Sequence, residues 1–127
     1  MAFFPITSNH FDKQFSKLTR KNAVFKAQAA KKIKGIALNP EIGVPKTHKL
    51  KGLRSLHISD HFVVVYIIFK DLVIFVEIDH HDRAYRAMEG LIVRLIEDGK
   101  LLSVLQRMGV GRDEFAQFIK ALGLGGQ

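Results

Sequence analysis

The stretch Phe62-Val63-Val64-Val65-Tyr66-Ile67-Ile68-Phe69 decides the fold of this chain. All of its residues are β-branched or aromatic, the types that favour strands over helices. They are apolar at every position and not only at alternate ones, which is typical of a strand covered on both faces. The run is too short to cross a bilayer. It therefore predicts the central strand of a sheet in a globular protein.

The sequence on either side of this strand predicts its partners. Within residues 53–58, Leu56 and Ile58 fall on one face of a strand and Ser55 and His57 on the other, and residues 72–78 form a second run rich in valine and isoleucine. Short turns at residues 59–61 and 70–71 join these runs to the central strand. Three antiparallel strands connected in this way form a meander.

Helical patterns flank the meander on both sides. Upstream, a short strand over residues 3–7 leads to two helices, of which the second covers about residues 22–38 and ends before Pro40. Downstream, apolar stripes recur at helical spacing from residue 88 onward. We expect an α+β fold: a small antiparallel sheet, two N-terminal helices packed on one face, and additional C-terminal helices.

Composition excludes several classes of function. The chain has 127 residues, of which 47% are hydrophobic and 25% charged, the proportions of one compact domain. It has no cysteine, which excludes thiol catalysis, thiolate metal sites and disulfides. No Walker loop, dinucleotide glycine fingerprint or HExxH pair supports nucleotide hydrolysis or zinc proteolysis. The N-terminus lacks the pattern of a signal peptide, so we expect a cytoplasmic protein with no membrane partner.

Positive charge is concentrated in the first half of the chain. The whole chain carries +8, but residues 1–54 carry twelve Lys and Arg against two acids, a net of +10, whereas residues 55–127 carry a net of −2. A one-sided positive field favours a polyanionic partner, most often nucleic acid. A solvated basic helix face explains the same charge equally well.

Five of the six histidines fall between residues 48 and 81, namely His48, His57, His61, His80 and His81. The predicted meander brings them toward one another, because they lie at strand ends, in the following turn and in the loop before the first strand. Histidine can both accept and donate a proton near neutral pH. The cluster therefore predicts a site for acid–base chemistry.

Basic residues beside this cluster make RNA a fitting substrate. Cleaving RNA without a metal needs a base for the ribose 2′-OH, an acid for the leaving 5′-oxygen and a cation for the phosphate. Four cations, Lys46, Lys49, Lys51 and Arg54, flank His48 and precede His57 in the sequence. Together the two sets supply every part that this reaction needs.

A metal site is the alternative use of clustered histidines, since imidazole is a common ligand. The chain offers no thiolate, and the nearby carboxylates are Asp60, Asp79 and Asp82. We therefore favour chemistry that uses no metal and no other cofactor. A single histidine in a turn, such as His61, is more often a surface residue without a role.

Three stretches follow a known family pattern. They are Lys46-Thr47-His48-Lys49-Leu50, Gly52-Leu53-Arg54-Ser55-Leu56-His57-Ile58 and Phe62-Val63-Val64-Val65-Tyr66, preceded by a basic helix that ends in Asn39-Pro40. Over roughly residues 3–86 the sequence resembles the RelE/ParE toxin superfamily. Within it, the sequence is most similar to the YafQ-type ribosome-dependent mRNA interferases.

The resemblance assigns roles to the candidate residues. It places catalytic histidines on His48, His57 and His81. His57 and His81 would carry out the acid–base steps, with His81 as the acid, and His48 would hold the scissile phosphate with Arg54. The three lysines named above would contact the RNA backbone or ribosomal RNA.

Two positions depart from the YafQ pattern. The aspartate–tryptophan pair that opens the central strand in that type is His61-Phe62 here. The ring of Phe62 can still stack on a base, and His61 can still bond a base or a phosphate. Sequence preference and the acid–base assignment depend on this difference.

The RelE type uses basic residues and a C-terminal tyrosine in place of histidines. Its arginine on the central strand falls on Val63, so this version of the site is not supported. Tyr85, with Arg83 or Arg86, corresponds to its C-terminal pair and would contact RNA.

The resemblance implies the toxin of a type II toxin–antitoxin system. Such a toxin would be an endoribonuclease that stops translation by cutting ribosome-bound mRNA. Its partners would be a cognate antitoxin, mRNA and the ribosome. Residues 1–86 would form the toxin core, and residues 87–127 would be a C-terminal helical extension that packs on the same domain or mediates a homodimer.

Two other functions stay open. A gyrase-targeting toxin of the ParE type shares the fold but lacks a catalytic cluster. A catalytically inactive member of the superfamily would only bind RNA through its basic half.

Overall fold

The computed structural model describes residues 3–46 and 52–122. The strands are β1 (Phe4–Thr7), β2 (Val44–Pro45), β3 (Arg54–His57), β4 (Phe62–Phe69) and β5 (Leu72–His80). The helices are α1 (Asn9–Thr19), α2 (Ala23–Leu38), the 3-10 turn η1 (Pro40–Ile42), α3 (His81–Arg86), α4 (Met88–Leu95), α5 (Gly99–Arg107) and α6 (Arg112–Ala121). Within these residues, no helix has the length and apolar character needed to cross a membrane.

The sheet confirms the predicted meander and extends it. Its strand order is β1-β5-β4-β3-β2, with β4 at the centre and antiparallel to both β3 and β5. β1 joins the far side of β5 in parallel, so the sheet is mixed. The loop expected before the first strand of the meander contains the short strand β2, because Val44 pairs with Ser55 of β3.

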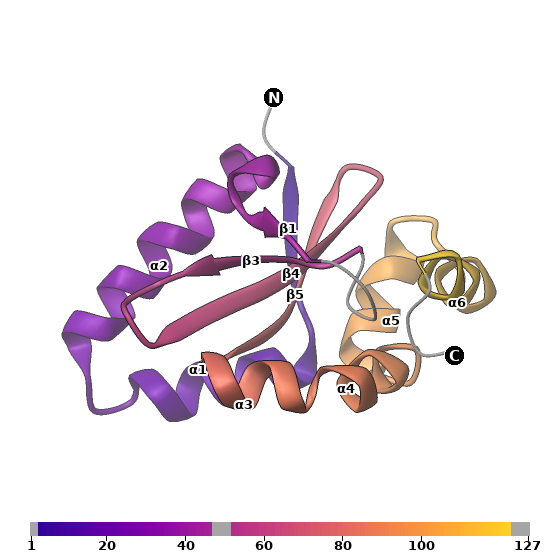
Figure 1. Cartoon of the computed structure of the whole chain (residues 1–127). Helices are drawn as coiled ribbons and strands as arrows, with labels where there is room; N and C mark the ends of the chain where they lie inside the picture. Colours follow the sequence, from indigo (N-terminus) through magenta and orange to yellow (C-terminus); the bar gives the residue numbers. More distant parts are fainter. Residues whose placement is uncertain (1–2, 47–51, 123–127) are drawn as a thin grey trace.

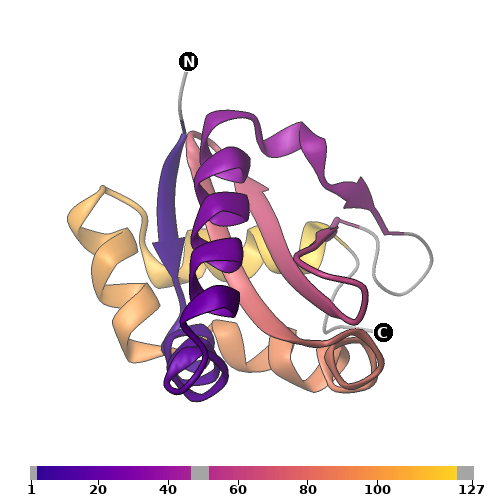
Figure 2. The ribbon, with the colours of Figure 1, turned by 90° about the vertical axis from the view of Figure 1, so that its left-hand side faces the viewer.

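The two N-terminal helices begin at side-chain caps and cover one face of the sheet. Ser8 Oγ accepts a hydrogen bond from the backbone of Phe11, and Asn22 Oδ1 accepts one from Phe25, which satisfies amides that each helix leaves open at its start. Phe11 and Phe25 then bury their rings against β4 and β5. Figures 1 and 2 show α2 lying along this face.

The C-terminal helices cover the opposite face. Leu101 of α5 and Phe115 of α6 are fully buried in one cluster with Val63 and Ile67 of β4. In Figure 2, α2 stands in front of the sheet and the orange and yellow helices lie behind it. The molecule therefore has three layers, and β4 is covered on both sides as its sequence predicts.

Helix α3 was not predicted and follows β5 without a linker. It has six residues, too few to show an apolar stripe in the sequence. His80 Nδ1 accepts a hydrogen bond from the backbone of Asp82 at 3.3 Å and caps the helix. This sharp change from strand to helix places the side chains of α3 beside the end of the sheet.

Candidate functional site

Four histidines meet where the β3–β4 hairpin and the end of β5 lie together. The ring centroids of His57 and His81 are 6.3 Å apart, and those of His80 and His81 are 4.8 Å apart. The ring of His61 stacks on that of His80 with centroids 5.9 Å apart. The backbone of His81 also donates a 2.8 Å hydrogen bond to the carbonyl of His61, which joins the hairpin turn to the start of α3.

His57 and His81 form the pair that could transfer protons. His57 is exposed, and His81 is half-buried opposite it. Oδ1 of Asp82 lies 2.9 Å from Nδ1 of His81. A carboxylate in this position keeps a proton on Nδ1, and leaves Nε2 available to accept or donate a proton.

A second polar group lies on the same side of β3. The Tyr85 hydroxyl donates to Ser55 Oγ at 3.1 Å, and Lys46 Nζ donates to the Tyr85 hydroxyl at 3.3 Å. The Lys46 ammonium also lies over the Tyr85 ring, 4.5 Å from its centroid. Ser55 and His57 alternate with Leu56 along β3 and so share one face. The lysine is therefore a positive charge held on the histidine face of this strand.

Three residues that were predicted to contact RNA do not join the hydrogen-bonded group of Ser55, Lys46 and Tyr85. Arg54 lies on the other face of β3, where its guanidinium donates to the carbonyls of Glu41 and Gly43 at 3.3 and 2.9 Å. Arg83 pairs with Asp79, with an Nη2–Oδ1 distance of 3.0 Å, and this hydrogen bond raises the pKa of the guanidinium. The ring of Phe62 packs edge-on against that of Phe25, with centroids 5.0 Å apart, and also edge-on against that of His80, with centroids 5.9 Å apart.

Three other candidates, His48, Lys49 and Lys51, lie outside the described residues. A backbone hydrogen bond joins the chain before these residues to the chain after them: the amide of Lys46 donates to the carbonyl of Leu53 at 2.9 Å. Tyr66 fixes the part of the chain that precedes Lys46. Its hydroxyl accepts a hydrogen bond from the backbone of Gly43 at 2.9 Å and donates one to the carbonyl of Pro40 at 2.5 Å. Burial of Tyr66 raises the pKa of its phenol, although the Gly43 bond and the Arg54 charge oppose the shift.

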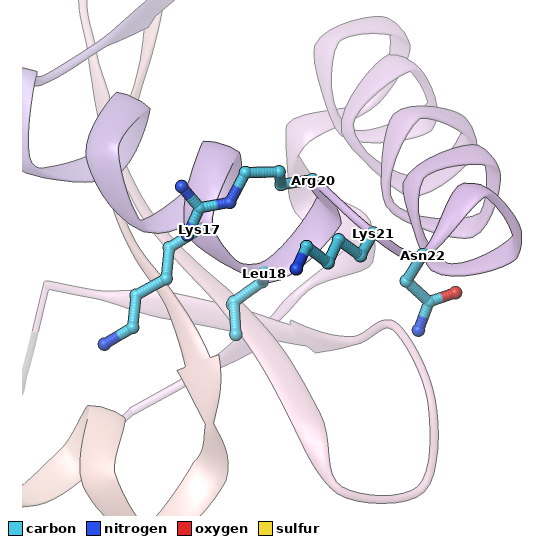
Figure 3. Close-up of a pocket in the computed structure, with 5 residues that line it drawn as sticks. All are labelled: Lys17, Leu18, Arg20, Lys21 and Asn22. Atoms are coloured by element: carbon cyan, nitrogen blue, oxygen red, sulfur yellow. The ribbon is translucent and has the colours of Figure 1, made fainter.

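A basic pocket lies at the corner between α1 and α2. Figure 3 shows Lys17, Arg20 and Lys21 extending around it, with Leu18 and Asn22. Its volume is about 460 Å³. None of the ion pairs among the described residues uses these three cations. The pocket offers unneutralised positive charge to an anion.

Sequence reasoning assigned no individual role to Ser55, His80 or Asp82, although His80 belonged to the predicted histidine cluster. Strand alternation with His57 could have identified Ser55, because the two residues share one face. The position of Asp82 depends on α3, a helix too short to be predicted from a sequence pattern, whereas His80 ends β5. The three histidines His61, His80 and His81 also present ligand nitrogens that all lie within 4.8 Å of one another.

Comparisons with known proteins agree with this architecture. The family described as the ParE toxin of the type II toxin–antitoxin system, parDE, matches residues 6–85. The chain belongs to the RelE/ParE toxin superfamily. The putative toxin RelE4 of Methanocaldococcus jannaschii is 32% identical over 77 residues, which are 59% of this chain and 82% of that protein. The chain therefore spans most of the length of this relative.

Two solved toxins share the fold. A mutant of the Escherichia coli toxin RelE in the free state superimposes with a TM-score of 0.54 at 18% identity, covering 67% of this chain and 90% of its own. The Escherichia coli DinJ–YafQ toxin–antitoxin complex gives a TM-score of 0.52 at 17% identity, covering 67% of this chain and 99% of the matched one. This RelE/ParE protein is thus the toxin of a type II toxin–antitoxin system with a RelE-like fold.

Proposed function

We propose that this toxin is an endoribonuclease that cuts ribosome-bound mRNA by acid–base catalysis without a metal. The observation that carries the proposal is the pairing of His57 with His81 across β3 and α3, with ring centroids 6.3 Å apart. A gap of this size lets a phosphodiester enter with one imidazole on the attacking side and the other on the leaving side. Each imidazole must come within about 2.6–3.2 Å of the oxygen that it serves.

The two rings divide the proton transfers between them. His57 removes the proton of the ribose 2′-OH, and the 2′-oxygen attacks the adjacent phosphorus. The bond from phosphorus to the 5′-oxygen breaks, and His81 donates a proton from Nε2 to that oxygen. The products are a 2′,3′-cyclic phosphate and a free 5′-hydroxyl, so no water or cofactor enters this step. Asp82 holds the other nitrogen of the His81 ring in place.

Charge on the phosphate oxygens needs a cation at the same face. Lys46 supplies it, because Tyr85 and Ser55 hold its ammonium on the histidine side of β3. Since Arg54 faces the other way, we assign the phosphate contact to Lys46, with His48 from the adjoining segment. Lys49 and Lys51 would contact the RNA backbone.

The basic pocket at the α1–α2 corner provides a second RNA contact. Phe25, three residues beyond Asn22 of the pocket, packs on Phe62 at the start of β4. Phe62 in turn packs edge-on against His80, with ring centroids 5.9 Å apart, so the pocket and the histidines lie at the same end of the sheet. Cations at this corner would bind phosphates of mRNA or ribosomal RNA. His61, exposed in the adjoining turn, would bond a base or a phosphate.

The partners follow from the toxin's family. A cognate antitoxin would bind this toxin, as the DinJ–YafQ complex is a toxin–antitoxin pair. We assign residues 1–86 to the toxin core and residues 87–127 to an extension of the same domain. Because α5 and α6 bury their apolar faces against the sheet, the extension serves the core of the monomer in this proposal, and a homodimer is the alternative.

Mapping mRNA 5′ ends after induction in cells tests this function. The wild-type toxin should produce new 5′ ends, and His57→Ala and His81→Ala should each lower cleavage about 100-fold or more. His10→Gln is the matched control, because His10 lies outside the cluster and its amide replacement can still bond Glu77. Cleavage should persist in excess chelator.

The same experiment separates the rival functions. The family match is to the ParE toxin, so a gyrase-targeting activity is the second candidate. Growth arrest with damaged DNA and intact mRNA would replace our proposal with that activity. Unimpaired growth with intact mRNA would leave only an RNA-binding protein.

A further inference from the structure

A group of three histidines beside the proposed catalytic pair has a geometry of its own. His61, His80 and His81 each present a ring nitrogen, and these atoms all lie within 4.8 Å of one another. The proposed cleavage uses only His81 of the three. His80 has no part in it. His61 is proposed to contact RNA, but a single exposed side chain could make that contact without the other two histidines beside it. The gathering of three imidazoles therefore needs a separate explanation.

The backbone holds the three rings together. His61 ends the β3–β4 turn, His80 ends β5, and His81 begins α3. Phe62 pairs with His80 across the sheet, and the amide of His81 donates to the carbonyl of His61 at 2.8 Å. The three Cα positions are thus fixed by a strand pairing and a backbone hydrogen bond. Only side-chain rotation is left to bring the nitrogens closer.

We propose that His61, His80 and His81 bind a divalent transition metal ion of the zinc class. Neutral imidazole is a preferred ligand of Zn²⁺, Cu²⁺ and Ni²⁺, whereas Mg²⁺ and Ca²⁺ select oxygen ligands. Two nitrogens that each bind Zn²⁺ at about 2.0–2.1 Å lie roughly 3.3 Å apart in tetrahedral geometry. The rings therefore need to approach by at most roughly 1.5 Å, and the side chain of His61 is exposed.

The neighbours of the three rings suit this use. Asp82 lies 2.9 Å from Nδ1 of His81, and a carboxylate on the non-ligating nitrogen orients a metal-bound histidine and increases its basicity. The Nδ1 of His80 accepts only a long bond of 3.3 Å from the backbone of Asp82. A neutral imidazole that binds a metal through Nε2 carries its proton on Nδ1. Metal binding by His80 therefore removes this acceptor, and the cost is small because the bond is long. The fourth position of the ion stays open to water.

Metal binding at this site would oppose RNA cleavage, a consequence that rests on the proposed function. A metal on Nε2 of His81 takes the nitrogen that donates the proton to the leaving 5′-oxygen. It also draws His81 toward His80 and away from His57. The toxin would cleave RNA when free of metal and lose activity as the ion binds.

Calorimetric titration of the untagged, chelator-treated protein with Zn²⁺ tests the site directly. Wild type should bind one equivalent, and Co²⁺ should give the absorption spectrum of a low-coordinate nitrogen site. His80→Asn should weaken Zn²⁺ binding at least about tenfold, because it removes a ligand and not merely an outer-shell partner. Asparagine keeps an acceptor for the cap of α3. His61→Ala, at an exposed turn, should weaken binding similarly, and His10→Gln should leave it unchanged.

The outcomes are decisive in either direction. Saturation at one equivalent that is lost in both His80→Asn and His61→Ala establishes the site. Wild type that fails to saturate, or variants that bind as tightly as wild type, would overturn it. In the cleavage assay, Zn²⁺ should inhibit wild type and spare His80→Asn. If Zn²⁺ binds but inhibits wild type and His80→Asn equally, the inhibitory role is refuted. If the toxin never cuts RNA, only the proposed function is refuted, because the titration does not depend on cleavage.

Discussion

Replacing Tyr66 by phenylalanine removes a single buried oxygen that holds the segment leading to Lys46. The side chain has no exposed surface. Its hydroxyl accepts from the amide of Gly43 and donates to the carbonyl of Pro40. Phenylalanine fills the same space but bonds neither group, so both are left without their partner inside the protein. Tyr66→Phe is therefore expected to destabilise the fold without disturbing its packing.

The size of the effect follows from those two bonds. Leaving a buried donor or acceptor unsatisfied costs about 1–3 kcal/mol, and we expect a total loss of about 2–3 kcal/mol. With an unfolding entropy of about 2.1 cal/mol/K per residue, a chain of this length should melt about 7–11 °C lower. The matched control is Tyr85→Phe, the other tyrosine of the chain. Tyr85 is half-buried, so water can replace its hydroxyl and the loss should be about 1 kcal/mol or less.

Thermal and urea unfolding followed by circular dichroism would measure both variants. A melting temperature of Tyr66→Phe within about 2 °C of wild type would refute the reasoning. It would mean that the Gly43 and Pro40 groups find other partners. An equal loss in Tyr85→Phe would also count against it, because burial would then not be the cause.

The pKa of Tyr66 gives the same prediction a dependence on pH. Burial raises the pKa of this phenol above its ordinary value of 10.0. The fold therefore favours the neutral form, and this contribution to stability is complete below pH 10 and is lost as the pH rises through the raised pKa. Wild type should lose more stability than Tyr66→Phe in this alkaline range. The single-tyrosine variant Tyr85→Phe allows the pKa itself to be read from tyrosinate absorbance.

Three further predictions concern the layers and their edges. Phe115→Ala, at a fully buried site of α6, should lower the free energy of unfolding in urea by about 3–5 kcal/mol. The control Val93→Ala, at an exposed site, should change it by less than about 0.5 kcal/mol. A small loss for Phe115→Ala would show that α6 does not complete the core. Asp98→Ala should cost about 1–2 kcal/mol, because this carboxylate caps α5 and also accepts from the first amide of α1, and an unchanged melt would contradict the cap. Breaking the exposed pair of Lys70 and Glu114 with Lys70→Ala should cost less than about 1 kcal/mol, and a larger loss that persists in high salt would be inconsistent with a surface ion pair.

Much of the fold could be predicted from local patterns. The apolar run of β4, the turn at residues 70–71 and the second helix, expected over about residues 22–38, are all present. Each of these features depends on residues close in sequence, where backbone preference and side-chain period act directly. The parallel pairing of β1 with β5 joins Phe4 to Leu72. Such a distant pairing leaves no periodic signal in either strand.

The candidate site was predicted in part for the same reason. A meander must return its strand ends to the same edge, so the sequence could bring His57, His61 and His80 together. The cations were harder to place. Arg54 and His57 are three residues apart on one strand, and strand alternation, applied strictly, would have placed them on opposite faces. The role of Lys46 depends on Tyr85, which reaches Ser55 only because α3 follows β5 directly.

By itself, the sequence determined the central strand, the two N-terminal helices, the basic first half and the gathering of histidines at one end of the meander. Local periodicity and short turns are enough to fix those features. Only the tertiary structure decided that the C-terminal helices bury the second face of the sheet, that His57 lies opposite His81, and that the rings of His80 and His81 stack. These arrangements depend on which surfaces pack together and where a six-residue helix begins, and contacts between distant residues determine both.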